Sequence, residues 1–139
     1  MALLPATTAR VSINTSKEIN EKIAEATRLS IENLKYKSKE DILKRLLELD
    51  QEWDTERILE TSAASFILIG TLLGFTKNKS WHLFSGVVGY FLLRHALQGW
   101  CPPLPLIRGL GVRTATEIQK ERNALLAILE KKNLNWSLK

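Results

Sequence analysis

Two uninterrupted apolar runs occupy the middle of the chain, and amphipathic segments precede and follow them. The runs cover residues 63–75 and 81–93, and the polar residues Thr76 to Ser80 separate them. A helix needs about 20 apolar residues to cross a bilayer, and each run approaches that length once its flanks are included. The pattern therefore predicts a hairpin of two transmembrane helices over residues 61–101.

The polar segments on either side of the runs have helical periodicity. Their apolar residues recur every three or four positions, as Ile19, Ile23, Ala26 and Leu34 do before the runs and Ile118, Leu125, Leu126 and Leu129 do after them. Ser38 and Asp41 resemble a capping box that begins a second N-terminal helix, and Thr114 and Glu117 resemble one that begins the last helix. These segments predict amphipathic helices and, with the apolar runs, an all-α protein.

We expect five regions along the chain. They are a flexible N-terminus (1–16), an amphipathic helical region forming a hairpin (17–60), the transmembrane hairpin (61–101), a connection broken by prolines and glycines (102–114) and a C-terminal amphipathic helix (115–139). The second helix of the amphipathic region is expected to run without a break into the first span. The alternative is a soluble helical bundle, in which the amphipathic helices cover the apolar runs.

Small residues within the runs predict how the two spans pack. Gly70 and Gly74 lie on the first run, and Gly86 and Gly89 on the second. Small residues let membrane helices approach closely, where the lipid provides no hydrophobic drive for association. We expect these four glycines to form the helix-packing face and to allow self-association.

The charge distribution agrees with a membrane location. No acidic residue lies between Glu60 and Glu117, so the net charge of +5 comes mainly from this window and its flanks. Unpaired bases suit anionic lipid, whereas they do not cluster on one polar face as in a nucleic-acid-binding protein. More bases flank the two runs than lie in the loop, which holds Lys77 and Lys79, and this predicts both termini in the cytoplasm.

Aromatic and basic residues at the run ends predict the membrane boundary. Trp81 and Trp100 bracket the second run, in positions typical of interfacial anchors. Arg94 lies near the end of that run, where its side chain can extend to the interface, and Arg108 lies just beyond it. We expect all four residues to act as interface anchors.

A distinctive motif follows the second run. Gly99, Trp100, Cys101 and Pro102 are followed by Leu110, Gly111, Val112, Arg113 and Thr114. This sequence, after two short glycine-bearing runs, resembles the YgaP-like transmembrane domain family, small uncharacterised inner-membrane hairpins of bacteria. In that family the hairpin occurs alone or behind a rhodanese domain that handles sulfane sulfur. The resemblance implies a bacterial inner-membrane hairpin.

Few residues are candidates for chemistry. Cys101 has no second cysteine to pair with, and it is either a packed apolar thiol or a reactive one. His82 and His95 lie too far apart on one helix to share a metal, so each is only a weak candidate to ligate a cofactor such as haem. No metal-binding motif, nucleophile–base pair or phosphate loop is present, and we expect neither an enzyme nor a bound cofactor or metal.

The sequence thus leaves two functions open. The first is a non-enzymatic accessory, anchoring or scaffolding subunit of a membrane assembly, which contacts lipid and a partner protein or a second copy. The second is a thiol-dependent sulfur or redox carrier that uses Cys101.

Overall fold

The computed structural model describes residues 4–137, and within that range every regular element is a helix. The helices are α1 (Arg10–Ile13), α2 (Lys17–Lys35), α3 (Lys39–Gln51), α4 (Thr55–Thr76), α5 (Ser80–Gln98), α6 (Leu104–Gly109) and α7 (Ala115–Ser137). The all-α prediction is confirmed. Residues 1–3 and 138–139, the outermost parts of the expected terminal segments, lie outside the described residues.

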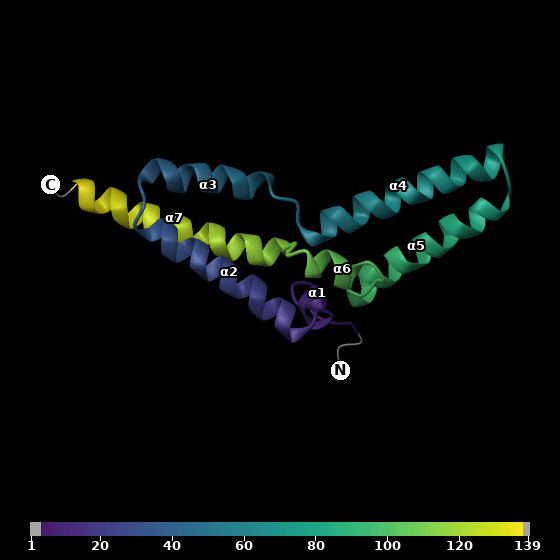
Figure 1. Ribbon diagram of the computed structural model, residues 1–139, viewed down its shortest axis with the longest axis horizontal. Coiled ribbons are helices and arrows are strands. Elements are labelled where there is room, and N and C mark those ends of the chain that lie inside the picture. Colours follow the sequence, from purple (N-terminus) through teal and green to yellow (C-terminus); the bar gives the residue numbers. More distant parts are fainter. Residues whose placement is uncertain (1–3, 138–139) are drawn as a thin grey trace.

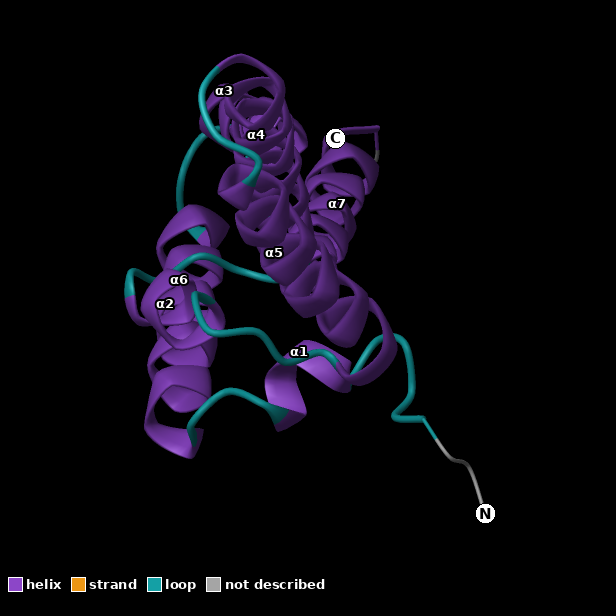
Figure 2. Cartoon of the chain, turned by 90° about the vertical axis from the view of Figure 1, so that its right-hand side faces the viewer, coloured by secondary structure: helices purple, strands orange, loops and turns teal. Residues whose placement is uncertain are grey.

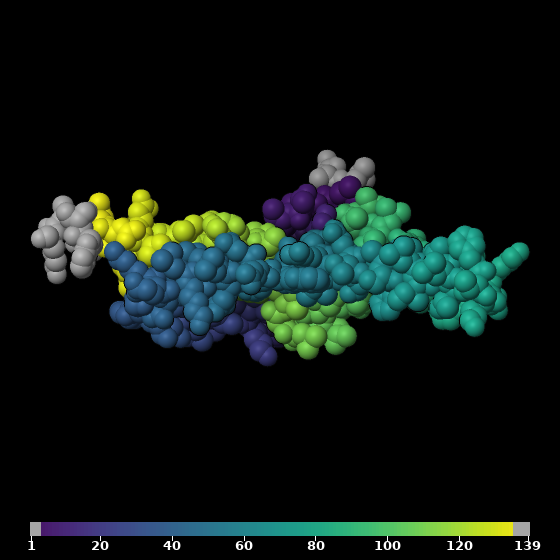
Figure 3. Space-filling view, turned by 90° about the horizontal axis from the view of Figure 1, so that it is seen from above, coloured from purple at the N-terminus to yellow at the C-terminus, as the bar shows by residue number. Residues whose placement is uncertain are grey.

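The helices form two groups joined end to end (Figure 1). We call α2, α3 and α7 the helical head and the antiparallel pair α4 and α5 the apolar hairpin. The short helices α1 and α6 lie where the two groups meet, and the space-filling view shows a long, narrow molecule (Figure 3). Both ends of the apolar hairpin therefore reach the head, while its loop lies at the far tip.

Helix α7 is the centre of the head. Helices α2 and α3, which we expected to form a hairpin within residues 17–60, each pack chiefly against α7 (Figures 1 and 2). Five buried residues form the core of this group: Ile42, Leu46 and Leu49 from α3, with Ile118 and Leu125 from α7. Burying them holds the head together, because removal of apolar surface from water is the main favourable term in folding.

Both predicted capping boxes are present. At the start of α3, the Asp41 N–H donates to Ser38 Oγ (3.1 Å) and the Ser38 N–H donates to Asp41 Oδ2 (3.3 Å). At the start of α7, the Thr114 N–H donates to Glu117 Oε2 (2.8 Å) and the Glu117 N–H donates to Thr114 Oγ1 (3.3 Å). Each box satisfies backbone donors that the helix itself leaves unpaired.

The chain breaks between α3 and α4, so the expected continuous helix is wrong. Residues 52–54 are not helical, and α4 begins anew with Asp54 as its N-cap, whose Oδ1 accepts from the Arg57 N–H (2.8 Å). Capping by Asp54 competes with helix propagation, because its carboxylate bonds the backbone in a non-helical conformation. The break lets α4 leave the head at a new angle (Figure 1).

The apolar hairpin packs through a few small residues. Gly70 and Gly74 are buried at the α4–α5 contact, where a Cβ would lie 2.5 Å from Ser85 Oγ and from His82 Cε1, respectively. On α5, by contrast, Gly86 has open space at that position and Gly89 meets only Ile67 at 3.9 Å. Of the four glycines expected at the packing face, only the pair on α4 is in close contact.

The outer surface of the apolar hairpin is covered with large apolar side chains. Twelve of them are exposed: Phe66, Leu68, Ile69, Leu72, Phe75, Trp81, Leu83, Phe84, Val87, Tyr90, Leu93 and Leu97. Within residues 4–137 one stretch, Lys39–Thr76, is long and apolar enough to cross a membrane, and 17% of its most apolar window is buried. The second run, in α5, does not meet this criterion and carries Arg94 and both histidines.

A bulky residue at Gly70 should separate α4 from α5. We expect Gly70→Leu to lower the free energy of unfolding by about 1–3 kcal/mol, because the new side chain overlaps Ser85 and the Trp81 carbonyl. Gly86→Leu is the matched control, since it places the same side chain in open space on the same pair. Thermal unfolding in detergent, followed by circular dichroism, measures both, and equal losses would contradict the assigned contact.

Candidate functional site

The head and the apolar hairpin meet around the backbone of Gly99. This residue ends α5 in the left-handed conformation (φ 79°), and a Cβ there would lie 2.3 Å from the Arg10 carbonyl oxygen. Only glycine satisfies both conditions, because other residues rarely adopt this φ and none fits against the Arg10 backbone. The fold therefore requires glycine at position 99, the first residue of the motif.

The connection after α5, which we expected prolines and glycines to break, is partly helical. Helix α6 begins at Leu104, and Pro105 occupies its first turn. Proline is tolerated there because backbone N–H groups in the first turn have no intrahelical acceptor. Gly111 (φ 87°) follows α6 and its N–H donates to the Arg108 carbonyl (2.9 Å). Two of the motif positions, Gly99 and Gly111, therefore end helices.

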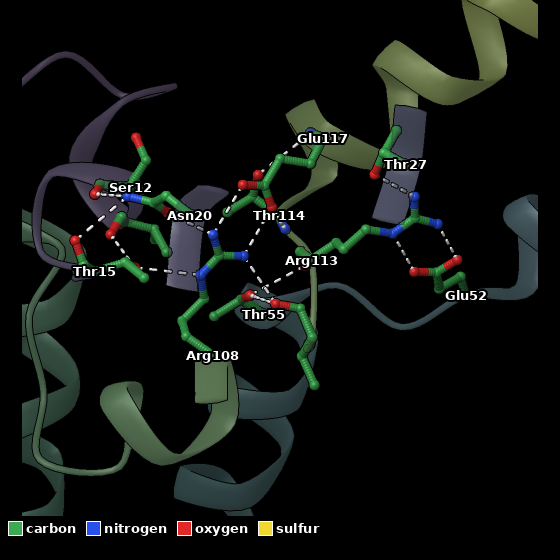
Figure 4. A network of polar contacts seen from close by, with 12 residues as sticks. Ser12, Thr15, Asn20, Thr27, Glu52, Thr55, Arg108, Arg113, Thr114 and Glu117 are labelled. Atoms are coloured by element: carbon green, nitrogen blue, oxygen red, sulfur yellow. Dashed lines mark hydrogen bonds and ion pairs between the residues drawn. The ribbon is translucent and has the colours of Figure 1, made fainter. Parts of the chain in front are cut away.

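Arg108 is fully buried at this junction, with 0% of its side chain exposed. All five of its N–H donors are used (Figure 4): Nε bonds Thr15 Oγ1 (3.2 Å), Nη1 bonds the Val112 carbonyl (2.8 Å) and Glu117 Oε2 (2.7 Å), and Nη2 bonds Asn20 Oδ1 (2.9 Å) and Glu117 Oε1 (2.8 Å). The expected interfacial position is therefore wrong, because this guanidinium is enclosed by protein. It joins α2, α6 and α7.

A second buried arginine extends the cluster toward α3. Arg113 forms ion pairs with Glu52 (Figure 4) and with Glu121, and Arg45 Nε donates to Glu121 Oε1 (3.0 Å). The Thr55 N–H donates to the Arg113 carbonyl (2.8 Å), so the first residue of α4 is held against the segment before α7. We call Arg45, Arg108, Arg113, Glu52, Glu117 and Glu121 the ionic junction.

The arginines keep Glu117 and Glu121 of the ionic junction ionised. Burial raises the pKa of Glu117, but hydrogen bonds from Arg108 and Thr114 outweigh it and hold the pKa below its usual value. Burial likewise raises the pKa of Glu121, and hydrogen bonds from Arg45, Ser30 and Arg113 lower it further than burial raises it. Both carboxylates are therefore charged at neutral pH and pair with the guanidinium groups.

The N-terminal segment is attached to the end of the apolar hairpin, which differs from the flexible N-terminus we expected. Arg10 Nη2 donates to Glu56 Oε1 (3.0 Å) on α4, and its Nη1 donates to the Ala96 carbonyl (3.1 Å) on α5. Asn14 Nδ2 donates to the Gln98 carbonyl (2.8 Å), an acceptor that the end of α5 leaves free. Helix α1 thus bridges both helices of the hairpin.

The candidate thiol lies beside one of the candidate histidines. Cys101 and His95 are 3% and 2% exposed, and the thiol lies against the imidazole. His95 Nε2 and Glu56 Oε2 are 3.1 Å apart, whereas His95 Nδ1 is buried and has no hydrogen-bond partner among the described residues. Glu56, His95 and Cys101 therefore form a line of carboxylate, imidazole and thiol.

An apolar groove of about 690 Å³ opens from this line. It runs between α4 and α5 at the end near α6, and Phe66, Phe84, Val88 and Leu92 line it together with Cys101 and His95. Its volume lies within the roughly 300–1,000 Å³ typical of ligand sites. The groove offers an apolar ligand one polar end, at the imidazole and the thiol.

The remaining predicted residues lie apart from the groove. His82 packs edge-to-face on Phe75 (4.9 Å between ring centroids) at the start of α5, whereas His95 lies near the end of that helix. Arg94 lies over the Trp100 ring (4.8 Å), and both this pair and Trp81 reach the surface. Two motif residues, Pro102 and Leu110, are exposed. No group of three His, Cys, Asp or Glu side chains able to hold a metal occurs among residues 4–137.

Sequence reasoning missed the acidic partners of the junction and groove. Glu56 lies 39 positions from His95, and Glu52 lies 61 positions from Arg113. One signal was available, because Glu52, Glu56 and Glu117 are among the acids nearest to the acid-free window on either side. Basic residues inside an acid-free window can form ion pairs with the acidic residues that flank the window, once the fold brings the two flanks together.

Comparison with known proteins gives no relative. No family model matches the chain, and no curated protein or solved structure is similar enough to match. The geometry of the groove and the ionic junction must therefore carry the functional argument.

Replacement of Arg108 by lysine should destabilise the head although the charge is kept. Lysine has three donors on one nitrogen and cannot supply the five bonds made here, so Asn20, Thr15 or Glu117 loses its partner. We expect the free energy of unfolding to fall by about 1–3 kcal/mol. Arg28→Lys, in an exposed pair with Glu25 on α2, is the control and should cost under about 1 kcal/mol. Urea unfolding followed by circular dichroism compares the two, and equal losses would refute the role of Arg108.

Acid should weaken the head through the carboxylates of Glu117 and Glu121. Their folded-state pKa values lie below the ordinary 4.5, so their contribution to stability is complete above that pH and is lost as the pH falls through the lowered values. Urea unfolding midpoints across the acid range measure this loss. Glu117→Gln should give a flatter pH dependence than wild type, and an unchanged slope would contradict the assignment.

Proposed function

We propose that this protein is a small membrane-anchored accessory subunit, in which the apolar hairpin enters the bilayer and the helical head carries the contacts to a partner. The observation that carries the proposal is the outer surface of the hairpin, where large apolar side chains are exposed over both helices and no acidic residue interrupts residues 61–116. Contiguous exposed apolar surface of this kind marks an interaction with a membrane or another protein.

The dimensions of the hairpin suit a bilayer. Helix α4 has 22 residues and α5 has 19, which at about 1.5 Å per residue gives lengths of roughly 33 Å and 28 Å. The hydrocarbon core of a bilayer is about 30 Å thick. The few polar groups of α5 have partners at the head end, since His95 bonds Glu56 and Arg94 stacks on Trp100.

The alternative of a soluble bundle fits the fold less well. That alternative requires the amphipathic helices to cover the apolar runs, but α2 and α3 direct their apolar faces at α7. A core helix of a soluble protein is mostly buried, whereas 17% of the apolar window in α4 is buried. The low buried fraction of this window supports a hairpin whose apolar surface contacts lipid.

The arrangement gives the proposed subunit an orientation. Both hairpin ends reach the head, so the head and the described ends of the chain lie on one side of the bilayer. The bases flanking the two runs outnumber Lys77 and Lys79 at the tip, which favours the cytoplasm for that side. The resemblance to the YgaP-like hairpin family supports a bacterial inner membrane.

The head offers a surface for a partner. Leu43 and Leu47 lie one turn apart on α3 and are exposed, as are Leu29 on α2 and Tyr36 directly after it. Exposed apolar positions one turn apart on a helix form the contacts of helix-in-groove recognition. These positions support a docking role for the head, and Gly86 on α5, which has open space beside it, is available to a second copy.

A second candidate function is a thiol-dependent carrier at Cys101. The observation that favours it is the buried His95 Nδ1, which has no partner among residues 4–137 and lies beside the thiol. An imidazole in this position accepts a thiol proton, as in cysteine–histidine pairs.

Carbonate extraction of membranes tests the anchoring role. We expect the wild-type chain in the carbonate-resistant fraction and the double variant Leu68→Asp with Leu72→Asp largely outside it, because a charge at the centre of a spanning helix costs about 2.5–3.5 kcal/mol. The matched control is Leu43→Asp with Leu47→Asp, since Leu47 and Leu68 are both 65% exposed and each pair is one turn apart. Wild-type protein in the soluble fraction would refute the proposal.

A further inference from the structure

We propose that Cys101 is a site of long-chain S-acylation, at which the apolar groove holds the hydrocarbon chain of an acyl thioester while the Cys101 thiol takes over its acyl group. The inference gives the second candidate function, the thiol-dependent role, a definite substrate class. It does not require the anchoring role, because the groove and the line of Glu56, His95 and Cys101 belong to the protein itself.

The location of the thiol selects an amphipathic substrate. Cys101 lines the groove beside the imidazole of His95, three residues after the end of α5. Beyond it the groove is lined by apolar side chains of α4 and α5, including Phe66, Phe84 and Val88. A long-chain acyl thioester has the same division, since its chain is apolar and its carbonyl and donor group are polar. When the hydrocarbon chain of the thioester lies in the groove, the thioester carbonyl lies beside Cys101 Sγ.

The neighbouring imidazole supplies the proton acceptor. His95 Nε2 contacts Glu56 Oε2 (3.1 Å), the Cys101 thiol lies against the same imidazole, and the other ring nitrogen, Nδ1, is buried. Nδ1 is the one buried side-chain polar atom without a hydrogen-bond partner in the part of the chain that the structure describes. A buried acceptor without a partner has lost its hydrogen bond to water and gained none in return. A proton from Cys101 would bind this nitrogen and remove that cost. Arg10 contacts the other oxygen of Glu56 (3.0 Å) and fixes the carboxylate.

The reaction is a transthioesterification. Cys101 Sγ–H gives its proton to His95 Nδ1, and the thiolate attacks the carbonyl carbon of the thioester. The new Sγ–C bond forms, the bond from that carbon to the donor sulfur breaks, and His95 returns the proton to the departing thiolate. The products are S-acylated Cys101 and the free donor thiol, with no net oxidation or reduction. Glu56 acts as a positioning residue.

Incubation of the purified full chain with palmitoyl-coenzyme A, followed by intact-mass and peptide mass spectrometry, tests the inference. We expect one palmitoyl group on Cys101 that neutral hydroxylamine removes and that is absent from Cys101→Ser and Cys101→Ala. His95→Asn should slow the reaction about 10²-fold, in the range typical of a lost general base. His82→Asn, on the same helix but near the hairpin tip, is the matched control and should react at the wild-type rate.

Two further readouts separate chemistry from folding. The rate of His95→Asn should rise more steeply with pH than the wild-type rate, because hydroxide must then remove the thiol proton that His95 accepts in the wild type. Ala63→Phe narrows the groove and should slow palmitoyl transfer while leaving transfer from acetyl-coenzyme A unchanged. Far-UV circular dichroism of each variant reports its fold.

Three outcomes would overturn the inference. They are no reaction at Cys101 in chains with wild-type circular dichroism, equal rates for His95→Asn and His82→Asn, or a sulfur adduct on Cys101 that a reducing thiol removes. The last outcome supports a sulfur carrier in place of an acyl acceptor. Failure of the anchoring role is seen separately in carbonate extraction, since acylation is measured in detergent on the purified chain.

Discussion

The structure depends on the burial of one guanidinium group. Arg108 has no exposed surface, and each of its five donors meets an oxygen from the segment after α1, from α2, or from α7 and the residues leading into it. Breaking a buried pair costs about 3–5 kcal/mol, because the remaining charge is left without compensation. The five hydrogen bonds of Arg108 have fixed directions and therefore specify how these segments are oriented relative to one another. They do so at the place where the head joins the apolar hairpin.

Local features of the fold could be predicted from the sequence, and distant pairings could not. The capping boxes at Ser38 and Thr114 are present because both partners lie within four residues. The role of Arg108 was misjudged, since a base after an apolar run has the same sequence pattern whether it meets lipid headgroups or Glu117. The break before α4 was missed because Asp54 acts as an N-cap only if α3 ends before it. The sequence pattern alone did not show that α3 ends there.

The candidate site shows the same division. Cys101 and His95 were recognised as two separate candidates, six positions apart in the sequence. The turn at Gly99 brings the chain back so that the thiol lies against the imidazole, and the start of α4 adds Glu56 from the other end of the hairpin. A site assembled from both ends of a hairpin cannot be read from the periodicity of either helix.

The position of α7 at the centre of the head has a consequence for biosynthesis. Helices α2 and α3 are made before the apolar hairpin, but their apolar faces pack on a helix that is made after it. During translation the head therefore stays open until residues near Leu125 have left the ribosome, and by then both runs of the hairpin have already emerged. Closure of the head is thus the last step, and a chain whose hairpin is misplaced keeps an uncovered apolar surface that chaperones and proteases recognise.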